Sequence, residues 1–171
     1  MKCPARKGTT LTEMMVTLTL FSVLTFAAMG AFNSSQDSLD WNYQALSLQK
    51  ELRKTLLTMT QEMRESSPSS PTPISISDNQ ILFQIPSGVS GNIITGWIPI
   101  VYALGANNTA TRTVNGQTTI IGNNIQALNF VYPVDAVTAP RTVQIQIVGS
   151  KTTLKRTINR TVIGQVVLRN P

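Results

Sequence analysis

Apolar and polar positions first mark out a long, nearly unbroken apolar run close to the start of the chain. Residues 14–32 contain only apolar residues, glycine, threonine and serine. A bilayer needs roughly 20 residues of helix, and Thr and Ser hydroxyls can bond to carbonyls of their own helix. The run therefore predicts a membrane-spanning helix, with one acid, Glu13, immediately before it.

Further along, residues 44–65 change to the period of an amphipathic helix. The apolar residues recur at spacings of three or four, which places them on one helical face. They are Ala45, Leu48, Leu52, Leu56, Met59 and Met63. We expect this stripe to pack against the rest of the chain. Residues 33–37 contain no proline, so the helix either continues through them or breaks there.

Three prolines within residues 68–73 end the helix, because proline can neither donate to a helical turn nor leave its predecessor helical. The chain after them is rich in alternating and β-branched positions, which favour strands. The predicted strands are 74–77, 80–85, 97–104, 111–114, 117–121, 125–132, 141–148 and 154–168. Asn115 and Gly116 predict a two-residue hairpin turn. Pro99 predicts an edge strand or a strand entry, and Gly164 predicts an interruption of the last strand. The fold class is α+β: a long N-terminal helix packed against an antiparallel sheet.

Charge and residue types restrict the possible functions. The 171-residue chain has a net charge of +6, and Lys2, Arg6 and Lys7 precede the apolar run. By the positive-inside bias, this N-terminus is cytoplasmic and the bulk of the chain is translocated. The chain has no histidine, and its single cysteine is Cys3. Because the usual bases, thiol nucleophiles and metal ligands are missing, we expect neither catalysis, nor a cofactor, nor a metal.

The N-terminal motif resembles a known family. Gly8 before a small residue, Glu13 five positions later and then an apolar helix resemble the class III prepilin signal of type IV pilins and type II secretion pseudopilins. The resemblance implies that prepilin peptidase cleaves between Gly8 and Thr9 and N-methylates Thr9. Residues 59–64 and 166–170 resemble the larger minor members, the J-type pseudopilins and PilW-type minor pilins.

This resemblance implies four segments: a leader peptide (1–8), a transmembrane and filament-core helix (9–33), an amphipathic soluble half (34–67) and a β head (68–171). It implies a structural subunit of a type IV pilus or type II secretion pseudopilus, at the tip or in a priming complex. Its partners would be other pilins, prepilin peptidase, the inner-membrane assembly platform and lipid. The protein would cross the bacterial inner membrane once, with its head in the periplasm, before entering the filament.

Glu13 is the expected assembly residue. A carboxylate in hydrocarbon costs several kcal/mol unless it is paired. In a bundle of such helices, the free amine of a neighbouring Thr9 would supply the pairing and select the axial register. The alternative is an interfacial acid at a helix N-terminus, which the helix dipole favours.

Two rival functions remain open. The first is a Sec-exported binding protein, cleaved near residues 28–30, whose β domain acts alone. The second is a DNA-uptake pilin whose basic head contacts phosphates; the same face would otherwise be solvated or contact an acidic neighbouring pilin. The candidate basic residues are Arg141, Lys151, Lys155, Arg156 and Arg160.

Overall fold

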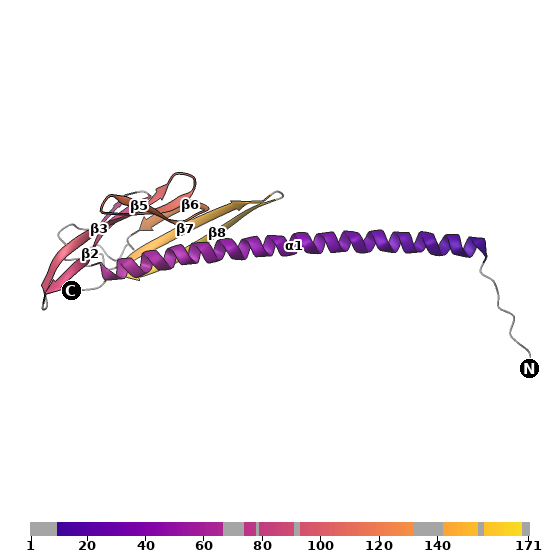
Figure 1. Ribbon diagram of the computed structural model, residues 1–171, viewed down its shortest axis with the longest axis horizontal. Coiled ribbons are helices and arrows are strands. Elements are labelled where there is room, and N and C mark those ends of the chain that lie inside the picture. Colours follow the sequence, from indigo (N-terminus) through magenta and orange to yellow (C-terminus); the bar gives the residue numbers. More distant parts are fainter. Residues whose placement is uncertain are drawn as a thin grey trace, which may run out of the picture. The chain divides into compact units, whose positions relative to one another are not determined.

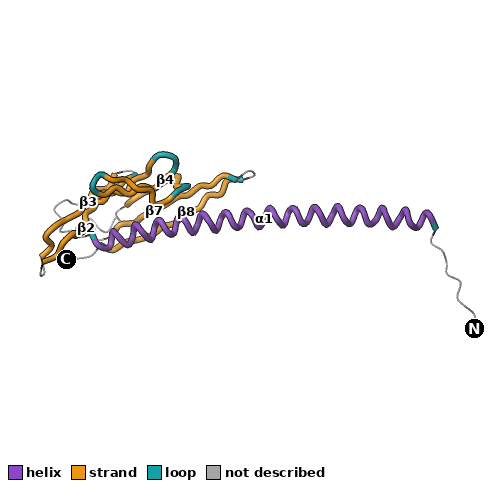
Figure 2. Tube along the Cα trace, viewed as in Figure 1, coloured by secondary structure: helices purple, strands orange, loops and turns teal. Residues whose placement is uncertain are grey.

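The computed structural model describes residues 10–66, 74–77, 79–90, 93–131, 142–153 and 156–168. The chain separates into two compact units, Met1–Tyr43 and Gln44–Pro171. The elements are α1 (Leu11–Glu65), β1 (Ser75–Ser77), β2 (Gln80–Ser90), β3 (Ile93–Gly105), β4 (Thr109–Val114), β5 (Gln117–Gly122), β6 (Ile125–Val131), β7 (Thr142–Thr152) and β8 (Thr157–Val167). Every described element after α1 is strand or loop (Figures 1 and 2). The expected α+β fold, with its helix first, is confirmed.

The first unit consists, in its described part, of the N-terminal portion of α1. The helix begins at Leu11 and is not interrupted at residues 33–37, where the sequence left a break open. The hydroxyls in the apolar run bond to carbonyls of their own helix, as expected. Thr17 donates to Met14 at 2.9 Å, and Thr25 donates to Phe21 at 2.8 Å. These bonds satisfy the hydroxyl donors inside the helix, so the surface of the run is effectively apolar.

The strands of the second unit form two antiparallel sheets, where the sequence predicted one. The five-stranded sheet has the order β1-β2-β3-β4-β5, and the three-stranded sheet has the order β6-β7-β8. β5 ends at Gly122, and Asn124 takes a positive φ of 57° before β6 begins. That left-handed residue turns the chain away from β5, and β6 pairs with β7 instead.

The hairpin predicted at Asn115 and Gly116 is confirmed. Both residues have positive φ, 50° and 78°, and the flanking residues Val114 and Gln117 pair directly. Two successive positive φ values in a two-residue loop are the geometry of a type I′ turn, whose twist matches that of the strands.

Two strand predictions need correction. β3 is an inner strand between β2 and β4, not an edge strand. Its described pairs with β4 begin at Ile100, however, so Pro99 lies where β3 is paired with β2 alone. Gly164 does not interrupt the last strand: β8 continues through it, and Gly164 pairs with Ile145.

The core of the second unit lies between α1 and the two sheets. The predicted stripe is confirmed: Leu48, Leu52, Met59 and Met63 are at most 1% exposed, and Leu56 packs against this core from its rim. The strands contribute Ile81, Phe83, Ile100, Tyr102, Ile125, Leu128, Ile145 and Ile147. Thr55 is also fully buried, although the apolar pattern did not include it.

Glycines bring the helix close to the three-stranded sheet. A Cβ atom at Gly149 of β7 would lie 2.7 Å from Leu52 Cδ2, and one at Gly164 of β8 would lie 2.8 Å from Leu56 Cδ1. β7 and β8 accordingly run beside the C-terminal part of α1 in Figure 1. Gly164 is therefore a contact position for the helix, which explains why the strand continues through it.

Candidate functional site

Glu13 lies in the first turn of α1, at the start of the apolar run. Its backbone amide donates to the carbonyl of Thr10 at 3.1 Å, and its side chain is exposed. The helix dipole favours a carboxylate at this position. The placement fits both an interfacial acid and an assembly residue. Gly8 and Thr9, the predicted cleavage site, lie outside the described residues.

The helix surface that follows Glu13 is apolar and exposed over its whole length. Its large side chains are exposed by 54% to 76% from Met14 to Phe32. A window of 18 residues there has a mean hydropathy of 1.9, with none of it buried. The helix is long and apolar enough to cross a membrane, and by length and composition a signal sequence would look the same. In either case, this surface requires lipid or other helices around it.

The structure describes three of the five candidate basic residues and places them at one end of the β7–β8 hairpin. Lys151 pairs with Ile158, two residues from Arg160, so Lys151 and Arg160 share a sheet face. Arg156 lies in the connection, where its backbone amide donates to Thr153 Oγ1 at 3.2 Å. Arg141 and Lys155 lie outside the described residues. A basic hairpin end is therefore present, and the full predicted face stays a prediction.

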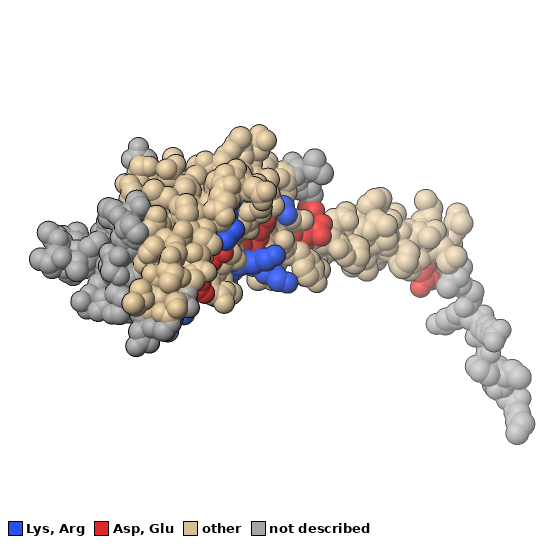
Figure 3. All heavy atoms as spheres, turned by 60° about the vertical axis from the view of Figure 1, so that its left-hand side comes forward, with Lys and Arg blue, Asp and Glu red and all other residues tan. Residues whose placement is uncertain are grey.

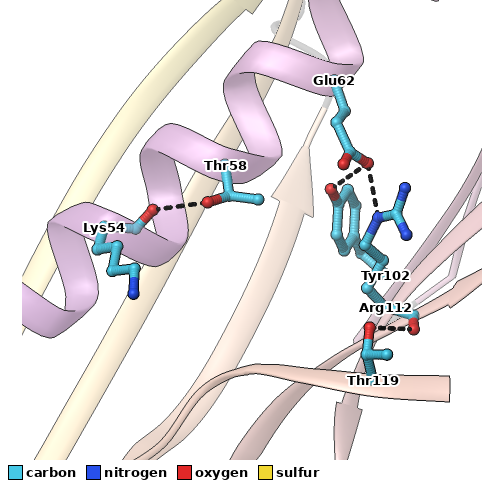
Figure 4. A network of polar contacts seen from close by, with 6 residues as sticks. All are labelled: Lys54, Thr58, Glu62, Tyr102, Arg112 and Thr119. Carbon is cyan, nitrogen blue, oxygen red and sulfur yellow. Dashed lines mark hydrogen bonds and ion pairs between the residues drawn. The ribbon is translucent and has the colours of Figure 1, made fainter.

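A polar network between α1 and the five-stranded sheet was not foreseen. The Glu62 carboxylate accepts hydrogen bonds from Tyr102 Oη at 2.7 Å and from Arg112 Nε at 2.9 Å (Figure 4). Tyr102 is fully buried. Burial, and then its hydrogen bond to Glu62, raise the pKa of the Tyr102 hydroxyl far above its ordinary value. The same carboxylate raises the pKa of Arg112. Tyr102 thus stays a neutral donor and Arg112 a cation, which fixes the polarity of the network.

A second polar contact joins α1 to the connection between β5 and β6. Glu51 accepts from the Asn123 amide at 3.1 Å and from Asn124 Nδ2 at 3.3 Å. One turn along the helix, Thr55 Oγ1 contacts the carbonyl of Ile121 at 3.3 Å. These contacts attach the helix to the end of the five-stranded sheet.

The sequence does contain a pattern that could have indicated these contacts. Residues 51, 55, 58 and 62 are polar, and each directly precedes an apolar residue of the buried stripe, at 52, 56, 59 and 63. Polar residues in such a row lie along one border of the apolar stripe. This pattern indicates where the apolar stripe ends, but it does not predict which residues of the sheets these polar side chains contact.

The described residues include no group of three or more His, Cys, Asp or Glu side chains that could hold a metal ion. A surface hollow of about 530 Å³ at the end of α1 is lined by Gln61, Arg64, Glu65, Val167 and Leu168.

Comparison of the chain with protein-family profiles, curated proteins and solved structures found no match.

Proposed function

We propose that this protein is a minor pilin or pseudopilin, a structural subunit of a type IV pilus or type II secretion pseudopilus. The observation that supports the proposal most strongly is that the two parts of α1 differ in their exposure. Its first part presents an exposed apolar surface with Glu13 in the first turn. Its second part is buried against two antiparallel sheets. A helix of this kind anchors a head domain and leaves the apolar part for lipid and for other helices.

In this proposal the chemistry is confined to maturation. Prepilin peptidase hydrolyses the bond between Gly8 and Thr9, and the new Thr9 amine is protonated at neutral pH. N-methylation of Thr9 keeps that charge. The amine then pairs with Glu13 of a neighbouring subunit, which offsets the cost of a carboxylate in hydrocarbon and sets the axial register. Contacts of this head-to-tail kind do not close, so they propagate a helical filament.

The proposed cellular location follows from the apolar N-terminal part of α1, which would span the membrane. The protein crosses the bacterial inner membrane once, with residues 1–8 cytoplasmic and the head in the periplasm, and then enters the filament. Its partners are prepilin peptidase, the assembly platform, lipid and other pilins. The likeness of residues 59–64 and 166–170 to the larger minor members supports a place at the tip or in the priming complex.

The intact mass and N-terminal sequence of the membrane-extracted protein test the proposal, in cells with and without prepilin peptidase. A start at Thr9, with or without one methyl group, only when the peptidase is present, is the expected result. A start near Gly30 or Ala31 in both strains would refute the proposal and leave a Sec-exported β domain.

The assembly role of Glu13 is tested by Glu13→Gln, which removes the charge at nearly constant shape. We expect cleavage and membrane insertion to continue, and incorporation into sheared filaments to fall at least tenfold, because the Thr9 amine loses its partner. Asp40→Asn is the matched control, since Asp40 is an exposed acid of the same helix beyond the apolar run. Equal incorporation of both variants would refute the role.

A further inference from the structure

Most charged side chains of α1 in the second unit divide by sign, with two acids facing the rest of the fold, the bases facing solvent, and Glu65 as an exposed exception. Glu51 and Glu62 are half-buried; Glu62 is bound to strand residues, and Glu51 to the connection between β5 and β6. Lys50, Arg53 and Lys54 are exposed on the helix surface, and Arg64 is exposed near its end. Two of the three acids thus point into the fold, while all four bases point to solvent.

The bases lie in one row with two exposed leucines. Leu46 and Leu57 are 63% and 66% exposed, although most large apolar side chains of this unit are covered. The spacing from residue 46 to residues 50, 53, 57 and 64 keeps all of them on one helical face. We name this row the basic stripe: Leu46, Lys50, Arg53, Lys54, Leu57 and Arg64. It extends roughly 27 Å along the helix at 1.5 Å per residue.

Among the residues that the structure describes, the cations of the basic stripe form no ion pair. Among the described residues, the Glu62–Arg112 pair supplies the salt bridge of the second unit, and no base of the stripe takes part in it. In Figure 4 the Lys54 side chain points away from Glu62 and Arg112. In Figure 3 the charged side chains on the visible face, acids as well as bases, lie in a band, while most of the head surface there is uncharged. Like charges three and four residues apart destabilise a helix, so an external anionic partner would relieve a cost that the isolated chain carries.

We propose that the basic stripe docks against an acidic surface of a different subunit. This inference rests on the proposed function, because it names the neighbour in the same filament. Asp and Glu side chains of that neighbour would pair with the bases. Leu46 and Leu57 would fill apolar recesses, as buried anchors do at protein interfaces. Charge pairs of this kind set the choice of partner and its register.

A second copy of this chain fits the basic stripe poorly. Residues 44–171 contain 11 Lys and Arg against five Asp and Glu. Among the described acids of the second unit, Glu51 and Glu62 are engaged, which leaves Glu65 exposed. Two such heads repel each other. This charge balance favours a heterotypic neighbour, which is what a subunit used in few copies requires.

An anionic membrane surface also fits poorly. An interfacial helix needs a broad apolar face to enter the headgroup region. In α1 that face is already covered, because Leu48, Leu52, Met59 and Met63 are at most 1% exposed. Leu46 and Leu57 alone remain for insertion from this half of the helix, so a protein surface is the better match.

The test places a photo-crosslinking amino acid at Leu57 of the full chain in its own cells. The same amino acid at Ile120 of β5, which is 62% exposed, is the control position. We expect the Leu57 position to yield an adduct with a different polypeptide, at a peptide with more Asp and Glu than Lys and Arg. The Ile120 position should not yield that adduct.

Charge reversal then tests the pairing itself. Lys50→Glu with Lys54→Glu should lower the adduct yield at least tenfold, and reversing the mapped acids of the partner should restore it. Gln117→Glu with Thr119→Glu adds negative charge at exposed positions of β5 and should leave the yield unchanged. Equal protease resistance of the variants shows that the fold is intact.

Several results would overturn the inference: an adduct with a second copy or with lipid, a contact peptide that is not acidic, a yield indifferent to reversal at Lys50 and Lys54, or no adduct at Leu57. The N-terminal sequence of the same sample separates this failure from failure of the proposed function. A start at Thr9 with an overturning crosslink refutes the docking surface alone. A start near Gly30 refutes the pilin assignment whatever the crosslink shows.

Discussion

Glu62 offers the sharpest test of how the helix is held on the head. Its carboxylate binds two strand residues at once, Tyr102 on β3 at 2.7 Å and Arg112 on β4 at 2.9 Å. The Glu62→Ala substitution removes both interactions and leaves the helix itself intact, since alanine is the best helix former. The loss of stability therefore reports on the contact between α1 and the five-stranded sheet.

The magnitude follows from the burial of the two partners. Tyr102 is fully buried, so its hydroxyl loses its acceptor where water does not replace it, which costs about 1–3 kcal/mol. The Glu62 and Arg112 side chains are 25% and 27% exposed, so their ion pair adds at most about 1 kcal/mol after screening by solvent. We expect Glu62→Ala to lower the free energy of unfolding by about 2–3 kcal/mol.

Urea unfolding of the detergent-solubilised full chain can measure this change. The chain has two tryptophans, and Trp97 lies on β3, so a Trp41→Phe background leaves the fluorescence of Trp97 to report on the five-stranded sheet. Tyr102→Phe in that background removes the hydroxyl and keeps the ring. We expect it to cost about 1 kcal/mol.

The double variant completes the cycle. If the hydroxyl and the carboxylate stabilise the fold through each other, Glu62→Ala should cost about 1 kcal/mol less in the Tyr102→Phe background than in its absence. The reasoning is refuted if Glu62→Ala changes stability by less than about 0.5 kcal/mol, the scatter of ordinary surface substitutions. Strict additivity of the two changes would equally refute it.

Three further predictions concern pH and glycine. The pKa of Tyr102 is raised above its ordinary 10.0, so above pH 10 the unfolded chain releases a proton that the folded chain keeps. Stability should then fall by up to about 1.4 kcal/mol per pH unit, and urea titrations from pH 9 to 11 should show a shallower fall for Tyr102→Phe; equal slopes would contradict this. Gly149→Ala would place a Cβ atom 2.7 Å from Leu52 Cδ2 and should lower the free energy of unfolding by about 1–3 kcal/mol by overpacking. In a Leu52→Ala background the same substitution should cost less, and an equal cost in both backgrounds would contradict overpacking. Gly116→Ala at a φ of 78° should cost about 1 kcal/mol, seen as a lower Tm, and an unchanged Tm would contradict the turn geometry.

Local patterns were enough to predict most of the secondary structure. The buried stripe of α1 follows from a spacing of three and four residues, and the strands follow from alternation. The Asn115–Gly116 turn follows from the positive φ that those residues tolerate. Each of these depends on neighbours within a few residues, which the sequence displays directly. The position of Glu13 at the start of an apolar helix can likewise be read from neighbouring residues in the sequence.

Long-range partners decided the rest. β6 pairs with β7 and not with β5, which divides one expected sheet into two, and Gly164 continues a strand because Leu56 fills the space above it. The basic residues at the β7–β8 hairpin were named from composition, and only strand register placed Lys151 and Arg160 on one face.

The sequence by itself determined a long helix with an apolar start, a single acid before it, a buried stripe and a series of strands. Tertiary structure alone decided that Glu51 and Glu62 point into the fold while Lys50, Arg53 and Lys54 point out. The physical reason is that a polar residue beside an apolar stripe is free to turn either way. Its direction is settled by a donor far away in the sequence. For Glu62 that donor is Tyr102, 40 residues away on a strand, and for Glu51 it is Asn123, 72 residues away in a connection between strands.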